Sequence, residues 1–96
     1  MTVKHRLEIE YCTQCRWMIR AAWVAQELLS SFESELLEVA LIPGKSGIFE
    51  VRIGNDMIWS LSSESRFPQP KELKQRVRDK VDPDRKMGHT DNRQLI

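Results

Sequence analysis

Two cysteines three positions apart are the residues of this chain best suited to chemistry. Cys12 and Cys15 form a C-x-x-C motif and are the only cysteines among the 96 residues. Thiols at this spacing can close a disulfide when their Cα atoms come within about 5–6 Å. A thiolate attacks a disulfide, and a second thiol nearby can then resolve the mixed disulfide. The pair therefore predicts thiol–disulfide chemistry, with Cys12 and Cys15 as catalytic residues.

The segments on either side of the motif indicate where it lies in the fold. Residues 3–11 alternate between apolar and charged side chains, which is typical of a strand with one buried face. Residues 15–32 contain neither glycine nor proline and repeat apolar side chains at helical spacing. The motif is therefore predicted at a strand-to-helix junction. The helix stripe expected to face the core consists of Met18, Ala22, Ala25, Leu29 and Phe32.

The start of the predicted helix suits a reactive thiol. Its first turn presents unpaired N–H groups and the positive end of the helix dipole, and both stabilise a thiolate. Arg16 is expected to add positive potential, with Thr13 and Gln14 as supporting residues between the cysteines. Position alone assigns Cys12 the exposed, attacking role. Cys15, one helical turn further on, takes the more buried, resolving role.

The rest of the chain completes an α/β domain. It predicts three more strands and a second helix, over residues 36–42, 48–53, 57–61 and 70–81. The order β-α-β-β-β-α favours a mixed sheet in which the first two strands are parallel and a hairpin adds antiparallel strands. We expect both helices to cover one face of the sheet and to leave the other partly wet.

Length and charge limit the classes of protein that fit. The length supports one domain, placed over residues 1–81, followed by a polar tail over residues 82–96 that we expect to be loosely draped. The formal net charge of +1 gives no reason to expect nucleic acid or a membrane as a partner. No secretory signal or membrane span is visible, so we expect a cytoplasmic protein, in which two cysteines stay available for redox chemistry or metal binding.

Other interpretations of the cysteine pair stay open. The thiols could simply be structural at a turn. They could also form half of a zinc site, but such a site needs four ligands, and only His5 and His89 are further soft candidates. A zinc site shared between two chains would supply the missing ligands. We assign no metal and no cofactor to the chain.

The predicted first helix carries more apolar surface than one core face needs. Trp23 lies on its polar side, with Trp17 and Ile19 on the flanks. Because tryptophan is enriched at interface hot spots, Trp17 and Trp23 are candidates for a protein interface or a homodimer contact. In this second function the dithiol would act as a redox sensor. The alternative is that Trp17 and Ile19 complete the core and Trp23 lies under arginine side chains.

Several features together resemble the selenoprotein W, T and H group, the Rdx proteins. They are the strand and motif over residues 8–15, the segment Pro43-Gly-Lys-Ser-Gly-Ile-Phe-Glu-Val51, the hairpin return Met57-Ile-Trp-Ser60, Phe67-Pro68, the charged last helix and the tail over residues 82–91. The resemblance implies a thioredoxin-like fold and a redox role for the motif. For a dithiol of this kind we expect thiol or disulfide proteins, or glutathione, as partners.

The resemblance bears on the roles of the two thiols as well. Selenoprotein members of the group carry selenocysteine at the second motif position, which is Cys15 here. The resemblance therefore implies that Cys15 attacks and Cys12 resolves, opposite to the assignment from position. The sequence alone leaves both assignments open.

Overall fold

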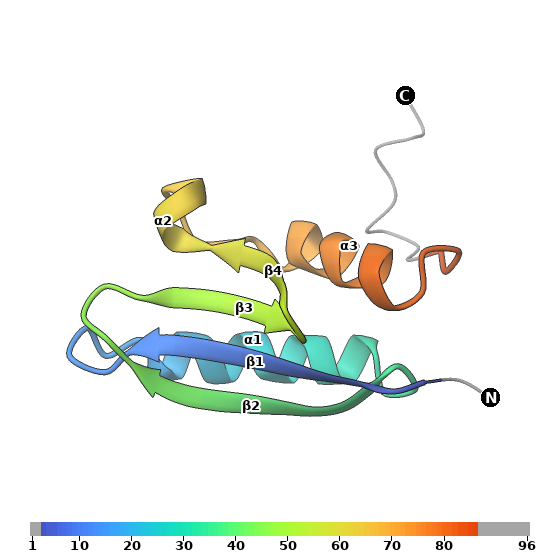
Figure 1. Cartoon of the computed structure of the whole chain (residues 1–96), viewed down its shortest axis with the longest axis horizontal. Helices are drawn as coiled ribbons and strands as arrows, with labels where there is room; N and C mark the ends of the chain where they lie inside the picture. The colour runs from blue at the N-terminus through green and yellow to red at the C-terminus, as the bar shows by residue number, and fades with distance from the viewer. Residues whose placement is uncertain (1–2, 87–96) are drawn as a thin grey trace.

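The computed structural model describes residues 3–86, which form a four-stranded sheet and three helices (Figure 1). Their bounds are β1 (His5–Cys12), α1 (Met18–Ser31), β2 (Leu36–Gly44), β3 (Phe49–Ile53), β4 (Asp56–Ser60), α2 (Leu61–Glu64) and α3 (Pro70–Val81). The predicted order of strands and long helices is confirmed. The last helix has the bounds that its apolar spacing and its opening proline predict.

The sheet has the order β2-β1-β3-β4 and is mixed, as expected. β1 pairs in parallel with β2 through the α1 crossover and antiparallel with β3, and β3 and β4 form a hairpin. In this register Ile9 lies opposite both Leu41 of β2 and Val51 of β3. β1 is therefore a central strand with neighbours on both sides, and its last residue, Cys12, is held by the sheet.

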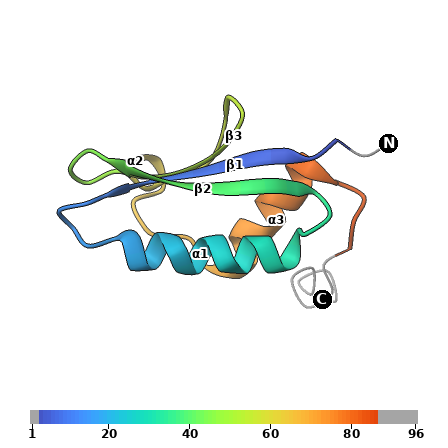
Figure 2. The same cartoon turned by 90° about the horizontal axis from the view of Figure 1, so that it is seen from below.

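Both long helices lie on one face of the sheet (Figure 2). The core between the two layers is made of apolar side chains from every strand and from both helices. Its fully or nearly fully buried members include Leu7, Ile9, Ala21, Leu28, Phe32, Phe49, Val51, Trp59, Leu73 and Val77. This two-layer arrangement accounts for the alternation of β1, because only its odd-numbered residues meet the helices.

The other face of the sheet is open and charged, which confirms the expectation of a wet face. Arg52 of β3 pairs with three carboxylates on β1 and β3, those of Glu8 at 3.4 Å, Glu10 at 3.1 Å and Glu50 at 2.7 Å. Arg6 pairs with Glu8 and Glu38. Four glutamates therefore surround two arginines, and this network is net negative.

The structure corrects three details of the predicted helices. α1 begins at Met18 and not at residue 15. Its buried side is also turned by one position, because Ala21, Val24, Ala25 and Leu28 face the core, whereas Met18 and Leu29 are exposed. The predicted loop after β4 contains the one-turn helix α2, which ends where Ser65 adopts a left-handed conformation (φ 64°). Its Glu64 pairs with Arg76 of α3 at 2.9 Å, which ties the turn to the last helix.

The beginning of the predicted polar tail contacts the domain. Arg85 pairs with Glu35 at 3.0 Å, and its guanidinium carbon lies 5.1 Å from the centroid of the Phe32 ring. Residues 87–96, the remainder of the predicted tail, lie outside the described residues. None of the helices within residues 3–86 has the length and apolar character needed to cross a bilayer.

Candidate redox site

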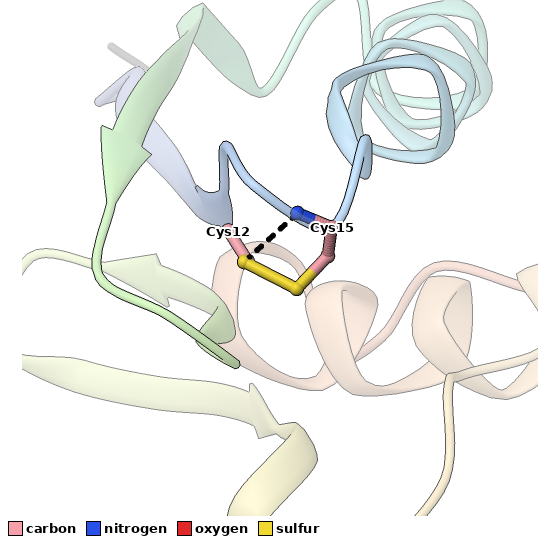
Figure 3. The surroundings of a disulfide bond; sticks show 2 residues. All are labelled: Cys12 and Cys15. Carbon is pink, nitrogen blue, oxygen red and sulfur yellow. Dashed lines mark hydrogen bonds between the residues drawn. A yellow bond between two sulfur atoms is a disulfide. The ribbon is translucent and has the colours of Figure 1, made fainter.

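The two cysteines meet at the turn between β1 and α1. Cys12 is the last residue of β1, and Cys15 follows in the turn. Their Sγ atoms are joined as a disulfide, with the two Cα atoms 5.4 Å apart (Figure 3). This separation is close to the most common value for disulfides. The backbone N–H of Cys15 also donates a hydrogen bond to the Cys12 Sγ atom, at 3.2 Å.

The turn itself is fixed by backbone hydrogen bonds. The Arg16 N–H donates to the Thr13 carbonyl at 3.2 Å, and the Trp17 N–H donates to the Cys12 carbonyl at 3.4 Å. Arg16 has a φ of 60°, a left-handed conformation that cannot continue into a helix. The dithiol therefore lies in a turn that precedes α1, and the prediction that Cys15 occupies the first helical turn is wrong.

The positive end of the α1 dipole is not neutralised by the helix's own side chains. The helix has no side-chain hydrogen bond at its N-cap, Trp17, and no acidic residue in its first turn. An acidic side chain there would compete with a thiolate for the positive end of the helix dipole. The expectation that the helix start favours a thiolate thus keeps its physical basis, although the hydrogen bond from the Cys15 N–H is the direct contact.

The two cysteines differ in exposure. Cys12 is completely buried, at 0%, whereas Cys15 is half-buried. The prediction from position alone, an exposed Cys12 and a more buried Cys15, is therefore wrong about accessibility. The physical reason is that Cys12 is still part of a central strand, whereas Cys15 lies in the turn that leaves the sheet.

Cys12 is in register with Gly44 at the end of β2. A Cβ atom at Gly44 would lie 2.6 Å from the Glu10 side chain and 2.8 Å from Ile48. Since these separations are shorter than any normal contact, only glycine fits without displacing its neighbours. The Glu10 and Ile48 side chains thus pack directly over Gly44, the residue of β2 that pairs with Cys12.

An aromatic cluster lies next to the motif turn. Trp17 packs edge-on against Phe67, with ring centroids 4.9 Å apart, and Phe67 packs in turn against Phe49, at 5.1 Å. The Arg20 guanidinium lies 4.0 Å from the Phe67 ring centroid. Sequence reasoning placed Trp17 on a helix flank but missed Phe49 and Phe67 as its partners. The sequence signal for them was the family resemblance, in which both residues take part, but it did not indicate that they contact Trp17.

The remaining predicted site residues are all near the surface. Thr13, Gln14 and Arg16 are exposed. Thr13 supports the turn through its backbone carbonyl, which accepts the hydrogen bond from the Arg16 N–H. Trp17 is half-buried and Trp23 is 47% exposed. Arg16, Trp17 and Trp23 line one shallow hollow of about 410 Å³, together with Ile19 and Arg20. The structure thus brings Arg16 and the two predicted interface tryptophans together on one side of α1, whereas Thr13 and Gln14 do not line this hollow.

The histidine predicted as a candidate zinc ligand lies elsewhere. His5 opens β1, seven residues before Cys12 at the other end of the strand, and it lines a separate hollow with Lys4 and Asp56. Over residues 3–86 no three His, Cys, Asp or Glu side chains gather as a metal-binding group. His89 lies outside the described residues.

A C-x-x-C disulfide at a strand-to-helix turn of a four-stranded mixed sheet defines the chain as a thioredoxin-like protein with a dithiol site. The model of the Rdx family matches residues 6–79, and the chain belongs to this family. The resemblance and the fold class predicted from the sequence are thereby confirmed.

Two crystal structures are similar to the chain. One is a selenoprotein W-related protein from Vibrio cholerae, with 49% identity and a TM-score of 0.81 over 83% of this chain and 100% of that chain. The other is a protein from Bordetella parapertussis, with 49% identity and a TM-score of 0.80 over 82% of this chain and 100% of that chain. None of the curated proteins compared matches the chain.

Proposed function

We propose that this protein is a thiol–disulfide redox protein that cycles between the Cys12–Cys15 disulfide and the dithiol. The observation that carries the proposal is the disulfide at the turn, with Cα atoms 5.4 Å apart and one half-buried cysteine. Membership of the Rdx family supports it. The cytoplasm is the compartment we propose for this cycle, because other thiols regenerate the dithiol there.

In the proposed reaction, Cys15 is the attacking thiol because it is the more exposed of the two cysteines. Its thiolate attacks one sulfur of a substrate disulfide, which releases one substrate thiolate and leaves a mixed disulfide on Cys15. The Cys12 thiolate then attacks the Cys15 Sγ atom, closes the Cys12–Cys15 bond and releases the second substrate thiolate. The substrate gains two electrons, and the protein loses two.

The reverse reaction uses the same two sulfurs. A thiol such as glutathione attacks the Cys15 Sγ atom of the disulfide and expels Cys12 as a thiolate. The hydrogen bond from the Cys15 N–H, at 3.2 Å, stabilises negative charge on the Cys12 sulfur. A leaving thiol with a lower pKa leaves faster, so this contact favours attack at Cys15.

The test is intact-protein mass spectrometry across a series of reduced-to-oxidised glutathione ratios. We expect a reversible two-dalton loss, the two hydrogens of a disulfide, with a midpoint between roughly −270 and −120 mV. The variant Cys12→Ser, which cannot form the bond, is the control and should show no such loss. Two thiols that stay inert at every ratio would overturn the proposal.

A second function, a protein-interaction surface with the dithiol as its redox sensor, is favoured by one observation. Ile19 is 77% exposed and Trp23 is 47% exposed, and both lie on α1 beside the motif turn. Sedimentation of the wild type and of Trp23→Ala tests the homodimer form of this idea. A dimer that is lost on substitution would support it, and a monomeric wild type would remove it.

A further inference from the structure

The hollow on α1 begins one residue after Cys15. We call it the α1 hollow; it is lined by Arg16, Trp17, Ile19, Arg20 and Trp23 and measures about 410 Å³. Because Arg16 directly follows Cys15 in the chain, one end of this hollow adjoins the motif turn. Its lining residues come from the end of the motif turn and from the first two turns of α1.

The apolar part of the hollow is rigid on one side and exposed on the other. Trp17 is fixed by edge-on packing against Phe67 and Phe49, at centroid distances of 4.9 and 6.4 Å. Ile19 and Trp23 lie four positions apart on the helix, so both project from the same face. Exposed tryptophan on a rigid support is typical of the centre of a peptide-binding surface.

The charged part of the hollow is positive. Among residues 3–86, no carboxylate pairs with Arg16 or Arg20, although the Arg20 guanidinium lies over the Phe67 ring. The arginines of the open sheet face differ, because Arg6 and Arg52 are surrounded by glutamates. The α1 hollow therefore offers two cations whose carboxylate partners are not supplied by the described part of the chain.

The conformation of Arg16 adds to this picture. Its φ of 60° is one that glycine adopts without penalty, whereas the Cβ atom of an arginine disfavours it. If position 16 served only to close the turn, glycine would be the more stable residue there. The arginine side chain thus places a positive charge at the edge of the α1 hollow at some expense in folding free energy.

We propose that the α1 hollow binds the chain around the reactive sulfur of a protein substrate and selects segments that carry acidic and apolar side chains. This inference rests on the proposed function. The acidic side chains would meet Arg16 and Arg20, and an apolar side chain would pack between Ile19 and Trp23. A second copy of this chain fits less well, because an isologous contact would bring the same arginines together. Two cations in a chain of net charge +1 are also too few for nucleic acid.

The experiment compares two synthetic peptides that contain the same disulfide and the same leucine. One has glutamate on both sides of the cysteine, and the other has lysine. The rate at which each peptide oxidises the reduced protein is measured by tryptophan fluorescence and by intact mass. We expect the acidic peptide to react about tenfold faster at low salt, and the difference to shrink at about 0.5 M salt because the charges are screened.

Variants then assign this selectivity to the hollow. Arg16→Asn keeps a residue that tolerates the left-handed conformation, and Arg20→Gln keeps a polar side chain without the charge. Each should lower the ratio of the two peptide rates by about threefold, and the double variant should bring it near one. The matched control is Lys4→Gln, which removes one exposed charge at the far end of β1 and should leave the ratio unchanged.

A neutral small disulfide, bis(2-hydroxyethyl) disulfide, separates the two possible failures. If it does not oxidise the wild-type dithiol, the proposed function itself is wrong. If it does, but the acidic and basic peptides react equally, only the inference about the hollow is overturned. A selectivity that survives in the double arginine variant would also overturn it, because the charge would then lie elsewhere.

Discussion

Arginines and tryptophans meet at two places in this molecule. At the first, which we call the Trp59 corner, the indole of Trp59 is 1% exposed, and the guanidinium carbons of Arg66 and Arg76 lie 5.0 and 4.3 Å from its ring centroid. Both arginines are paired with carboxylates, Arg66 with Glu72 and Arg76 with Glu64, each with one contact at 2.9 Å. The corner joins β4, α2 and α3 and satisfies its own charges.

The α1 hollow has the same kinds of residue in a different state. Trp23 is 47% exposed, and within residues 3–86 neither Arg16 nor Arg20 has a carboxylate partner. The comparison teaches that residue type alone does not separate a structural cluster from a binding surface. What separates them is whether the fold supplies the opposite charges and buries the rings.

The largest difference between the two places should be in stability. Trp59→Ala removes a buried ring and the hydrogen bond from its Nε1 to the Arg66 carbonyl, at 3.0 Å, so it should lower the free energy of unfolding by about 3–5 kcal/mol. Trp23→Ala removes an exposed ring and should change it by less than about 1 kcal/mol. Urea unfolding of the reduced proteins measures both. Equal losses would mean that Trp23 is part of the core.

Substitution of an arginine should likewise destabilise the protein more at the Trp59 corner than at the α1 hollow. Arg76→Gln loses the ion pair with Glu64, a hydrogen bond to the Ile58 carbonyl at 3.1 Å and the contact with Trp59. We expect a loss of about 2 kcal/mol. Arg20→Gln loses only the contact with Phe67, worth about 0.5–1 kcal/mol. If Arg20→Gln proved the more destabilising of the two, the hollow would have to be regarded as structural.

The left-handed residues allow a matched pair of stabilising changes. Arg16→Gly and Ser65→Gly both relieve a non-glycine residue at a positive φ, of 60° and 64°, and each should raise the free energy of unfolding by about 1 kcal/mol. Only Arg16→Gly should also reduce the preference for acidic peptides. Thermal unfolding and the peptide rates together test this, and a loss of preference in Ser65→Gly would count against the assignment.

The stability of the Trp59 corner should also depend on pH, with a smaller effect than the substitutions above. The hydrogen bonds from the Arg66 guanidinium hold the pKa of Glu72 at about 2, below its ordinary value of 4.5, and the Gln69 N–H acts in the same direction. Because this pKa is depressed in the folded state, Glu72 contributes stability that is complete above pH 4.5 and is lost as the pH falls toward 2. Glu72→Gln should make the free energy of unfolding depend less on pH between 4.5 and 2. A curve that keeps the slope of the wild type would show that Glu72 does not carry it.

Much of this fold could be predicted from the sequence because its signals are local. The alternation over residues 3–11, the proline that opens the helix over residues 70–81 and the cysteine spacing each depend on near neighbours in the chain. The family resemblance added the thioredoxin-like fold, because it combined motifs that are weak one by one.

The sequence could not predict which cysteine is buried. Strict alternation along β1 turns Cys12 away from the helices, yet it is fully buried at the end of a central strand paired with Gly44, 32 positions later. The start of α1 depended likewise on the left-handed conformation of Arg16, for which an arginine gives no sequence signal. Phe49 and Phe67 reach the motif turn only through the tertiary fold.

The central claim is that Cys15 presents the reactive sulfur and Cys12 is its buried partner. The most direct test measures how fast oxidised glutathione forms an adduct on the single remaining thiol of reduced Cys12→Ser and Cys15→Ser, followed by intact mass. The account predicts that Cys12→Ser, which retains the half-buried thiol of Cys15, reacts at least about tenfold faster than Cys15→Ser. Equal rates, or a faster reaction at Cys12, would contradict it.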